Sequence, residues 1–120
     1  MRTLLSTLIL SVAVNAAEVQ KTNEQFVVAK GLAVRPFATQ EQLSNPSSID
    51  VDDRGRVWVA EAFNYRKKTR KAGDRILILE DSSGDGRADK TTVFYQNPDI
   101  DGVHGVCVLG NMAIVSVSDR

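Results

Sequence analysis

Cysteine and histidine are almost missing from this sequence, which has one of each among its 120 residues. A single cysteine cannot form an intramolecular disulfide. The sequence contains no CxxC or CxxCH motif, so it carries neither a covalently bound haem nor a cysteine-ligated zinc of its own. No Ser/His/Asp set, phosphate-binding loop or glycosidase carboxylate pair can be assigned either. The common catalytic signatures are therefore absent.

Net charge is also missing, because 15 Lys and Arg residues balance 15 Asp and Glu residues. No global electrostatic attraction to nucleic acid or to anionic lipid is expected. A chain of 120 residues holds one small domain at most, which excludes a two-domain enzyme. Its hydrophobic content of 42% is typical of a globular chain rather than a disordered one.

The one long apolar segment lies at the start of the chain. Residues 4–14 are apolar apart from three hydroxyl side chains, and a short basic start precedes them. Val14 and Ala16 place small residues at the −3 and −1 positions of a cleavage site. We therefore predict a signal peptide over residues 1–16, a polar tether over 17–30, and export to the periplasm or cell envelope. A membrane anchor is the alternative, but the run is shorter than the roughly 20 residues that a transmembrane helix needs.

From Phe26 onward the sequence indicates β-strands and shows no amphipathic helical repeat. The apolar runs at 57–60 and 76–79 lack polar alternation, which predicts strands covered on both faces. The run at 91–95 is more polar and is expected nearer a sheet edge. The predicted strands are 26–28, 32–38, 49–51, 57–60, 76–79, 91–95, 106–109 and 112–117.

The strand pattern repeats along the chain. A hairpin over 49–59 is followed by two further strands and then by a second hairpin over 106–115, whose first strand begins 57 residues later. Four short strands followed by a restart are typical of a β-propeller blade. We predict an all-β partial propeller over 31–120, with blade one at about 47–96 and the start of blade two at about 103–120. The chain is expected to be a fragment that is inactive alone; a stand-alone β-sandwich is the alternative.

An acidic turn over residues 81–89 is the most specific local motif. Oxygen-bearing side chains stand at its positions one, three, five and nine, a glycine stands at position six, and a carbonyl follows at position seven. This spacing is typical of a calcium loop. Thr92 stands at position twelve, where a full calcium loop has a bidentate glutamate, so a plain Asp/Gly turn is the alternative. The predicted metal ligands are Asp81, Ser83, Asp85, Arg87 through its carbonyl, and Asp89.

His104 is the candidate catalytic residue, because an imidazole titrates near neutral pH and can act as a general base. A hydrogen-bonded turn residue is the alternative. Cys107 lies in an apolar strand and is expected to be buried. Glu61, Asn64 and Tyr65 are candidate site residues only because they follow the predicted strand at 57–60, where the chain leaves the sheet.

A basic run occupies residues 66–71. Such a run is usually a solvated loop, and contact with an anionic ligand or partner is the alternative. The run has no interleaved aromatic residues, so a nucleic-acid partner is not expected.

Several stretches together resemble the N-terminal β-propeller region of the membrane-bound dehydrogenase family of planctomycete-type bacteria, which is related to the glucose/sorbosone dehydrogenases. The stretch at 45–65 taken alone also resembles NHL-repeat and gluconolactonase-like propellers. The resemblance covers about residues 30–117. It rests on GLAVRPFA at 31–38, NPSSIDVDDRGRVWVAEAFNY at 45–65, GDRILILEDSSGDGRAD at 73–89, VFY at 93–95 and GVCVLGNMAIV at 105–115.

The resemblance implies a six-bladed parent propeller in which the strand at 32–38 closes the ring. It implies a quinone-dependent dehydrogenase that oxidises a carbohydrate or alcohol with pyrroloquinoline quinone and calcium. The quinone-binding residues are expected in later blades, and a c-type cytochrome with its haem, absent from this chain, accepts the electrons. His104 stands in a place similar to the family's catalytic histidine, although its register against Gly105 differs. The alternatives are a non-catalytic propeller that binds a glycan or protein, and a lactonase-like hydrolase.

Overall fold

The computed structural model describes residues 26–118, which fall into two compact units that divide after Arg35. The signal peptide predicted over 1–16 lies outside the described residues, as does most of the predicted tether. In the first unit, residues 26–35 form no strand, and the N–H of Leu32 donates to the carbonyl of Ala29 in a turn.

The strands predicted at 26–28 and 32–38 are wrong for this structure, because neither run forms a strand. Within the described residues neither run joins a sheet ladder, and a strand without a ladder leaves its N–H and C=O groups unpaired. The β-prone composition of these runs is therefore not sufficient to place them in a sheet.

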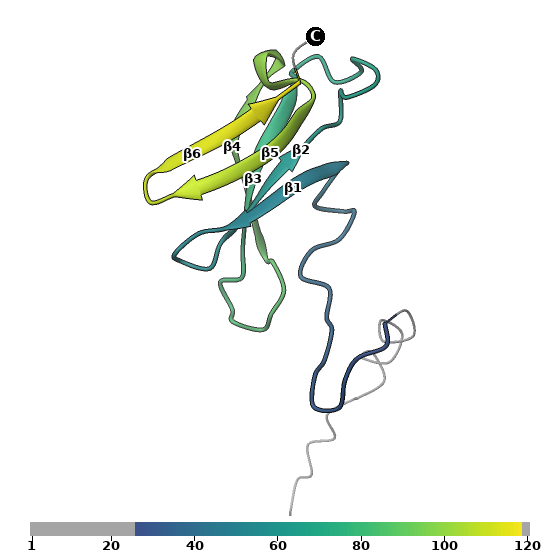
Figure 1. The fold of residues 1–120 in the computed structure, drawn as a ribbon, viewed down its shortest axis with the longest axis vertical. Helices are drawn as coiled ribbons and strands as arrows, with labels where there is room; N and C mark the ends of the chain where they lie inside the picture. Colours follow the sequence, from purple (N-terminus) through teal and green to yellow (C-terminus); the bar gives the residue numbers. More distant parts are fainter. Residues whose placement is uncertain (1–25, 119–120) are drawn as a thin grey trace, which may run out of the picture. The chain divides into compact units, whose positions relative to one another are not determined.

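The second unit is all-β, as predicted, and its described residues form two antiparallel sheets (Figure 1). The first sheet has the order β1-β2-β3-β4, and β5 pairs with β6 in a separate hairpin. The elements are β1 Pro46–Val51, β2 Val57–Glu61, β3 Asp74–Glu80, β4 Lys90–Asn97, the 3-10 turn η3 Pro98–Ile100, β5 Val103–Leu109 and β6 Met112–Val117.

The two central strands of the first sheet are covered on both faces, as their uninterrupted apolar runs predict. Val59 on β2 and Leu77 on β3 are paired and almost fully buried on one face. Ala60 and Ile76 are paired and equally buried on the other face. By contrast, most of β4 is exposed at the sheet edge, which confirms the prediction for the more polar strand.

A different layer covers each face of the first sheet. The β5–β6 hairpin packs on one face, where Val106 joins a buried cluster with Trp58 and Ile78 (Figure 1). On the opposite face, Phe37 and Leu43 pack against the buried side chains of the central strands. The core of this unit therefore has three layers, with the four-stranded sheet in the middle.

The hairpins β1–β2 and β5–β6 share one register. Ile49 pairs with Val59, and the residues 57 and 56 positions later, Val106 and Val115, pair in the same way. Even the β-bulge repeats, because it lies between positions 46 and 48 in the first hairpin and between 103 and 105 in the second. The predicted repeat is therefore confirmed at the level of the hairpin.

Candidate functional site

His104 is the bulged residue of β5, at the position that Ser47 occupies in β1. A bulge redirects the side chain of its extra residue and is often found beside active sites. The Nε2 atom of His104 lies 2.5 Å from the hydroxyl of Ser118. Its ring meets Tyr65 edge to face, with centroids 5.2 Å apart and planes at 77°. The structure therefore brings together two of the candidates that the sequence offered.

A surface hollow of about 480 Å³ surrounds this pair. Its volume lies within the range of small-molecule sites. The lining combines aromatic rings with amide, hydroxyl, imidazole and guanidinium groups, and it includes no Asp or Glu. The lining residues are Asn45, Pro46, Ser47, Ala62, Phe63, Tyr65, Arg66 and His104.

Asn64 holds the loop that carries the aromatic side of the hollow, residues 62–73, which we call the basic loop. Its side chain is 1% exposed. The Oδ1 atom accepts the N–H groups of Thr69 at 3.0 Å and Arg70 at 2.8 Å, and Nδ2 donates to the carbonyl of Arg70 at 2.8 Å. These bonds fold the loop back on itself beside Tyr65, so Asn64 serves the site as scaffold.

Two buried carboxylates join the basic loop to the start of β5. Asp74 accepts the N–H of Asn64 at 2.7 Å and the N–H of Gly102 at 2.8 Å. Asp101 accepts the N–H of Asp74 and the Nδ2 of Asn64, both at 3.0 Å. Because buried N–H groups are costly to leave unpaired, this network fixes the distance between Tyr65 and the strand that carries His104.

Glu61, another candidate by location, is fully buried at the end of β2. Its carboxylate accepts from Arg75 Nε at 2.5 Å, from Arg70 Nη1 at 3.1 Å and from the N–H of Ser44 at 2.7 Å. Burial alone would raise the pKa of Glu61, but hydrogen bonds from Arg75, Ser44 and Arg70 outweigh it and hold the pKa below its usual value. This carboxylate stays ionised and structural, away from the hollow's lining.

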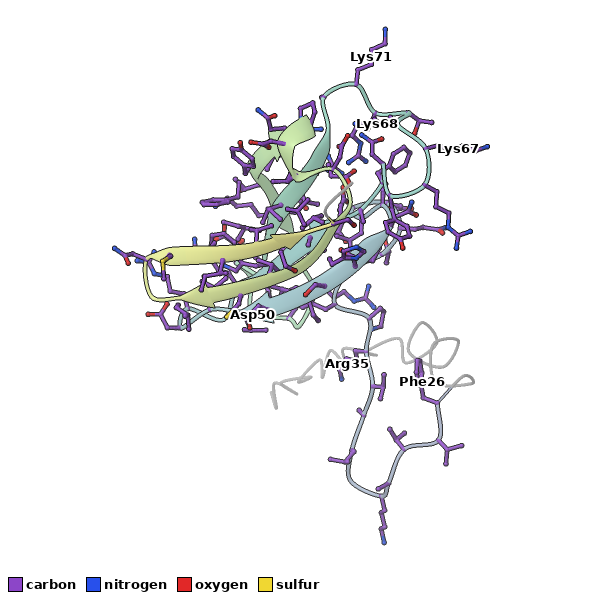
Figure 2. All side chains as sticks on the ribbon, turned by 45° about the horizontal axis from the view of Figure 1, so that its top comes forward. Phe26, Arg35, Asp50, Lys67, Lys68 and Lys71 are labelled. Carbon is purple, nitrogen blue, oxygen red and sulfur yellow. The ribbon has the colours of Figure 1, made fainter. Side chains whose placement is uncertain are left out.

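The basic run at 66–71 divides into an inner and an outer part. The guanidinium of Arg70 stacks over Phe63, with its carbon 4.4 Å from the ring centroid, while it also bonds Glu61. Lys67 and Lys71 project outward from the basic loop (Figure 2). The solvated-loop interpretation therefore holds for the outer lysines and fails for Arg70, which is part of the loop's packing.

The acidic turn at 81–89 is closed by its own hydrogen bonds. The carboxylate of Asp81 accepts the N–H groups of Gly84 and Gly86, each at 2.7 Å, and Asp89 accepts the N–H of Ser82 at 3.0 Å. The bond from Gly86 is the main cause that lowers the pKa of Asp81, and the bond from Ser82 does the same for Asp89. The turn is thus ordered by backbone donors.

The other predicted metal ligands lie in the same turn and are exposed: Ser83, Asp85 and Arg87. The N–H of Arg87 donates to Asp85 at 2.9 Å. Over residues 26–118, no three His, Cys, Asp or Glu side chains are grouped so as to hold a metal ion. Calcium binding by this turn therefore stays a prediction from the sequence.

Cys107 is exposed, so the prediction of a buried cysteine is wrong. It pairs with Ile114 on the face of the β5–β6 hairpin that points away from the first sheet, and Ile114 is 49% exposed. Strand alternation puts Val106 and Val108 on the inner face instead.

The sequence reasoning missed Phe63, Asn45 and Ser47 as lining residues and took Arg66 only as part of a charge run. One signal was available for Ser47, because it lies 57 residues before His104 in the repeat. Asn45 and Phe63 carry no such signal, since they enter the hollow through loop geometry. Asn45 has a positive φ of 50°, which is uncommon outside glycine and places it at the entry to β1.

No helix among the described residues is long and apolar enough to cross a membrane. A family model described as a domain of unknown function, DUF7133, matches residues 18–119. No curated protein and no solved structure matches the chain.

Proposed function

We propose that this chain, which belongs to the DUF7133 family, forms part of an exported β-propeller whose hollow at Tyr65 and His104 binds a carbohydrate. The observation that carries this proposal is the lining of the hollow, where exposed aromatic rings stand beside several uncharged hydrogen-bonding groups. The quinone-dependent dehydrogenase suggested by the resemblance is the wider setting in which such a site would act.

The shared register of the two hairpins supports the propeller. Val106 on β5 is 8% exposed because it packs on the first sheet. Ile49, its equivalent on β1, and Val51 lie on the face of the first sheet opposite to the β5–β6 hairpin, and they are 63% and 56% exposed. A preceding unit that packed on β1 as the first sheet packs on β5 would cover these side chains. Stacked units of this kind are what a propeller consists of.

The chemistry of the hollow suits a sugar ring. A sugar presents an apolar C–H face and a rim of hydroxyl groups, and it is recognised by an aromatic side chain together with placed polar groups. Phe63 is 37% and Tyr65 is 48% exposed, so both rings offer surface to a ligand. Asn45 and Ser47 line the same hollow and supply an amide and a hydroxyl.

Calorimetric titration of the full chain with a panel of neutral and acidic oligosaccharides tests the proposal. Tyr65→Ala should weaken binding about tenfold or more, which corresponds to about 1.4 kcal/mol, because the stacking surface is lost. The matched control is Tyr95→Ala, since Tyr95 is 41% exposed on β4 and does not line the hollow. Equal affinities for the Tyr65 and Tyr95 variants would contradict the proposal.

Oxidation of the bound sugar is the second candidate function, and the contact of His104 with Ser118 favours it. The Nε2 atom already bonds a hydroxyl, so a sugar hydroxyl that replaced Ser118 would give its proton to a general base at the same atom. The hydride of the neighbouring carbon would have to pass to a quinone held by residues outside this hollow. Pyrroloquinoline quinone carries three carboxylates, whereas the hollow's lining has one guanidinium, that of Arg66, so the hollow alone does not fit this group.

A substitution separates the two functions. His104→Gln keeps a hydrogen-bonding side chain but removes the base, so sugar oxidation by the complete, quinone-loaded propeller should fall about 100-fold, much more than sugar binding weakens. Unchanged oxidation would leave His104 as a binding residue only.

A further inference from the structure

We infer that the sugar held in the hollow is an acidic one, whose carboxylate or sulfate group contacts Arg66 of the basic loop. This inference rests on the proposed function and names its ligand class. Three features of the described residues lead to it: the sign of the charge at the hollow, the fixed shape of the basic loop, and the presence of a guanidinium and an aromatic ring in one lining.

Charge at the hollow is of one sign although the whole chain is neutral. Arg66 is in the lining, no Asp or Glu is, and Lys67, Lys68 and Lys71 lie on the adjoining loop (Figure 2). Lys68 lies 3.9 Å from Asp101, a weak pairing for an exposed lysine. Over residues 26–118, Arg66, Lys67 and Lys71 form no salt bridge with a carboxylate. The cationic groups of these three side chains are therefore not committed to a carboxylate of the protein.

The basic loop is held in one shape, unlike an ordinary solvated charge run. Asn64 bonds the backbone of Thr69 and Arg70 from within, and Arg70 is held by Glu61 and by the ring of Phe63. Arg70 is thus paired with Glu61, a carboxylate that it shares with Arg75, whereas Lys67 and Lys71 project outward (Figure 2). A fixed loop loses little entropy when it meets a ligand, which favours recognition over mere solubility.

Arg66 and Tyr65 offer the two contacts that an acidic sugar needs. A guanidinium can bind a carboxylate or sulfate through two parallel hydrogen bonds, and it keeps its charge at every physiological pH. An aromatic ring beside it meets the C–H face of the same sugar. A neutral sugar would use the ring and leave the guanidinium and the neighbouring lysines in water, so discrimination should depend on the acidic group.

The test compares matched ligands on the full chain by calorimetry at low and moderate salt. Oligogalacturonate and its fully methyl-esterified form differ only in the masked carboxylate, and a sulfated galactan oligomer and its desulfated form test the sulfate. We expect at least one acidic form to bind about tenfold tighter than its neutral partner, with the advantage shrinking as salt rises. The two pairs show which acidic group is preferred. Polyglutamate serves as an anion without a sugar ring.

Two variants assign the effect to the basic loop. Arg66→Gln should bring the affinities for the acidic form and its neutral partner to within about twofold of each other, because the guanidinium that binds the acidic group is lost. Arg54→Gln is the matched control, because Arg54 is exposed in the turn between β1 and β2 and does not line the hollow. Loss of preference in both variants would contradict a role for Arg66.

The outcomes distinguish this inference from the proposed function. If acidic and neutral forms bind equally and both depend on Tyr65, the sugar site stands and the inference fails. If no oligosaccharide binds in a Tyr65-dependent way, both fail. Polyglutamate binding as tightly as the acidic sugar would overturn the inference too, because the loop would then recognise charge alone.

Discussion

The hairpins β1–β2 and β5–β6 have the same register and the same bulge but different surroundings. Trp58 on β2 is 6% exposed, whereas its equivalent on β6, Ile114, is 49% exposed. The first hairpin lies inside a four-stranded sheet with layers on both faces, and the second has a neighbour on one face only. The strand register of a hairpin is therefore determined by its own sequence, whereas the burial of its side chains depends on whether another layer packs against each face.

The bulged residues of the two hairpins, Ser47 and His104, differ in what their side chains contact. Ser47 uses its hydroxyl to bond the carbonyls of Ala60 at 3.2 Å and Val103 at 2.8 Å, which joins the two sheets. His104, at the equivalent position, reaches Ser118 and the hollow. Both bulged residues line the hollow, but Ser47 also joins the two sheets, whereas His104 presents an imidazole there.

The largest expected loss of stability is at Gly73, beside the first sheet, and Gly110, in the turn of the second hairpin, is its matched comparison. At Gly73, with φ +88°, an added Cβ would lie 2.1 Å from the backbone carbon of Asn97. Gly73→Ala should therefore lower the free energy of unfolding by about 3 kcal/mol or more. Gly110 has φ +60° and open space around it, so Gly110→Ala should cost only about 1 kcal/mol. Urea unfolding of both variants measures this, and similar losses would contradict the comparison.

Equivalent valines on the two hairpins test the difference in burial. Val59 is 1% exposed between two layers, and Val115, 56 positions later, is half-buried against one layer. Val59→Ala should lower the free energy of unfolding by about 2 kcal/mol, and Val115→Ala by about half as much. The same unfolding measurement applies, and an equal or larger loss of stability at Val115 would contradict the lesser burial of the second hairpin.

The smallest expected effect is on how the free energy of unfolding depends on pH. Only the first hairpin has a carboxylate in its turn, so only this hairpin should respond to acid. Burial would raise the pKa of Asp52, but bonds from the Trp58 indole and from Arg56 outweigh it and lower the pKa to about 2. A depressed pKa stabilises the fold above the ordinary value of 3.8, and this contribution is lost as the pH falls from there through about 2. The equivalent position in the second hairpin is Leu109, which does not titrate.

Asp52→Asn should therefore lower stability near neutral pH and have little effect at pH values near 2. Fluorescence of Trp58, the one tryptophan in the sequence, follows unfolding in both proteins. If the difference between them did not shrink with acid, the stabilising role of this carboxylate would be wrong.

The sequence predicted the strands from residue 46 onward well, because alternation and turn residues are local signals. It predicted the apolar layers at 57–60 and 76–79 for the same reason. It failed at 26–28 and 32–38, where strand formation depends on a distant partner, and at Cys107, whose burial depends on which face another layer covers. These failures concern contacts that no local pattern records.

The candidate site was predicted in part. His104 and Tyr65 were found, one as a rare residue type and the other by its place after a strand. Glu61 and Asn64 were grouped with them but serve as buried scaffold, which only their hydrogen-bond partners reveal. Phe63 and Asn45 enter the hollow through the fold of the loops, so sequence spacing could not have shown them.

Amide chemical-shift mapping of the full chain, titrated with an acidic oligosaccharide, locates the binding site residue by residue. We expect shift changes at residues 63–66 and at His104, with the acidic turn at 81–89 unaffected. Shifts that are absent from 63–66 and His104, or that gather at 81–89 instead, would contradict the assignment of the hollow as the binding site.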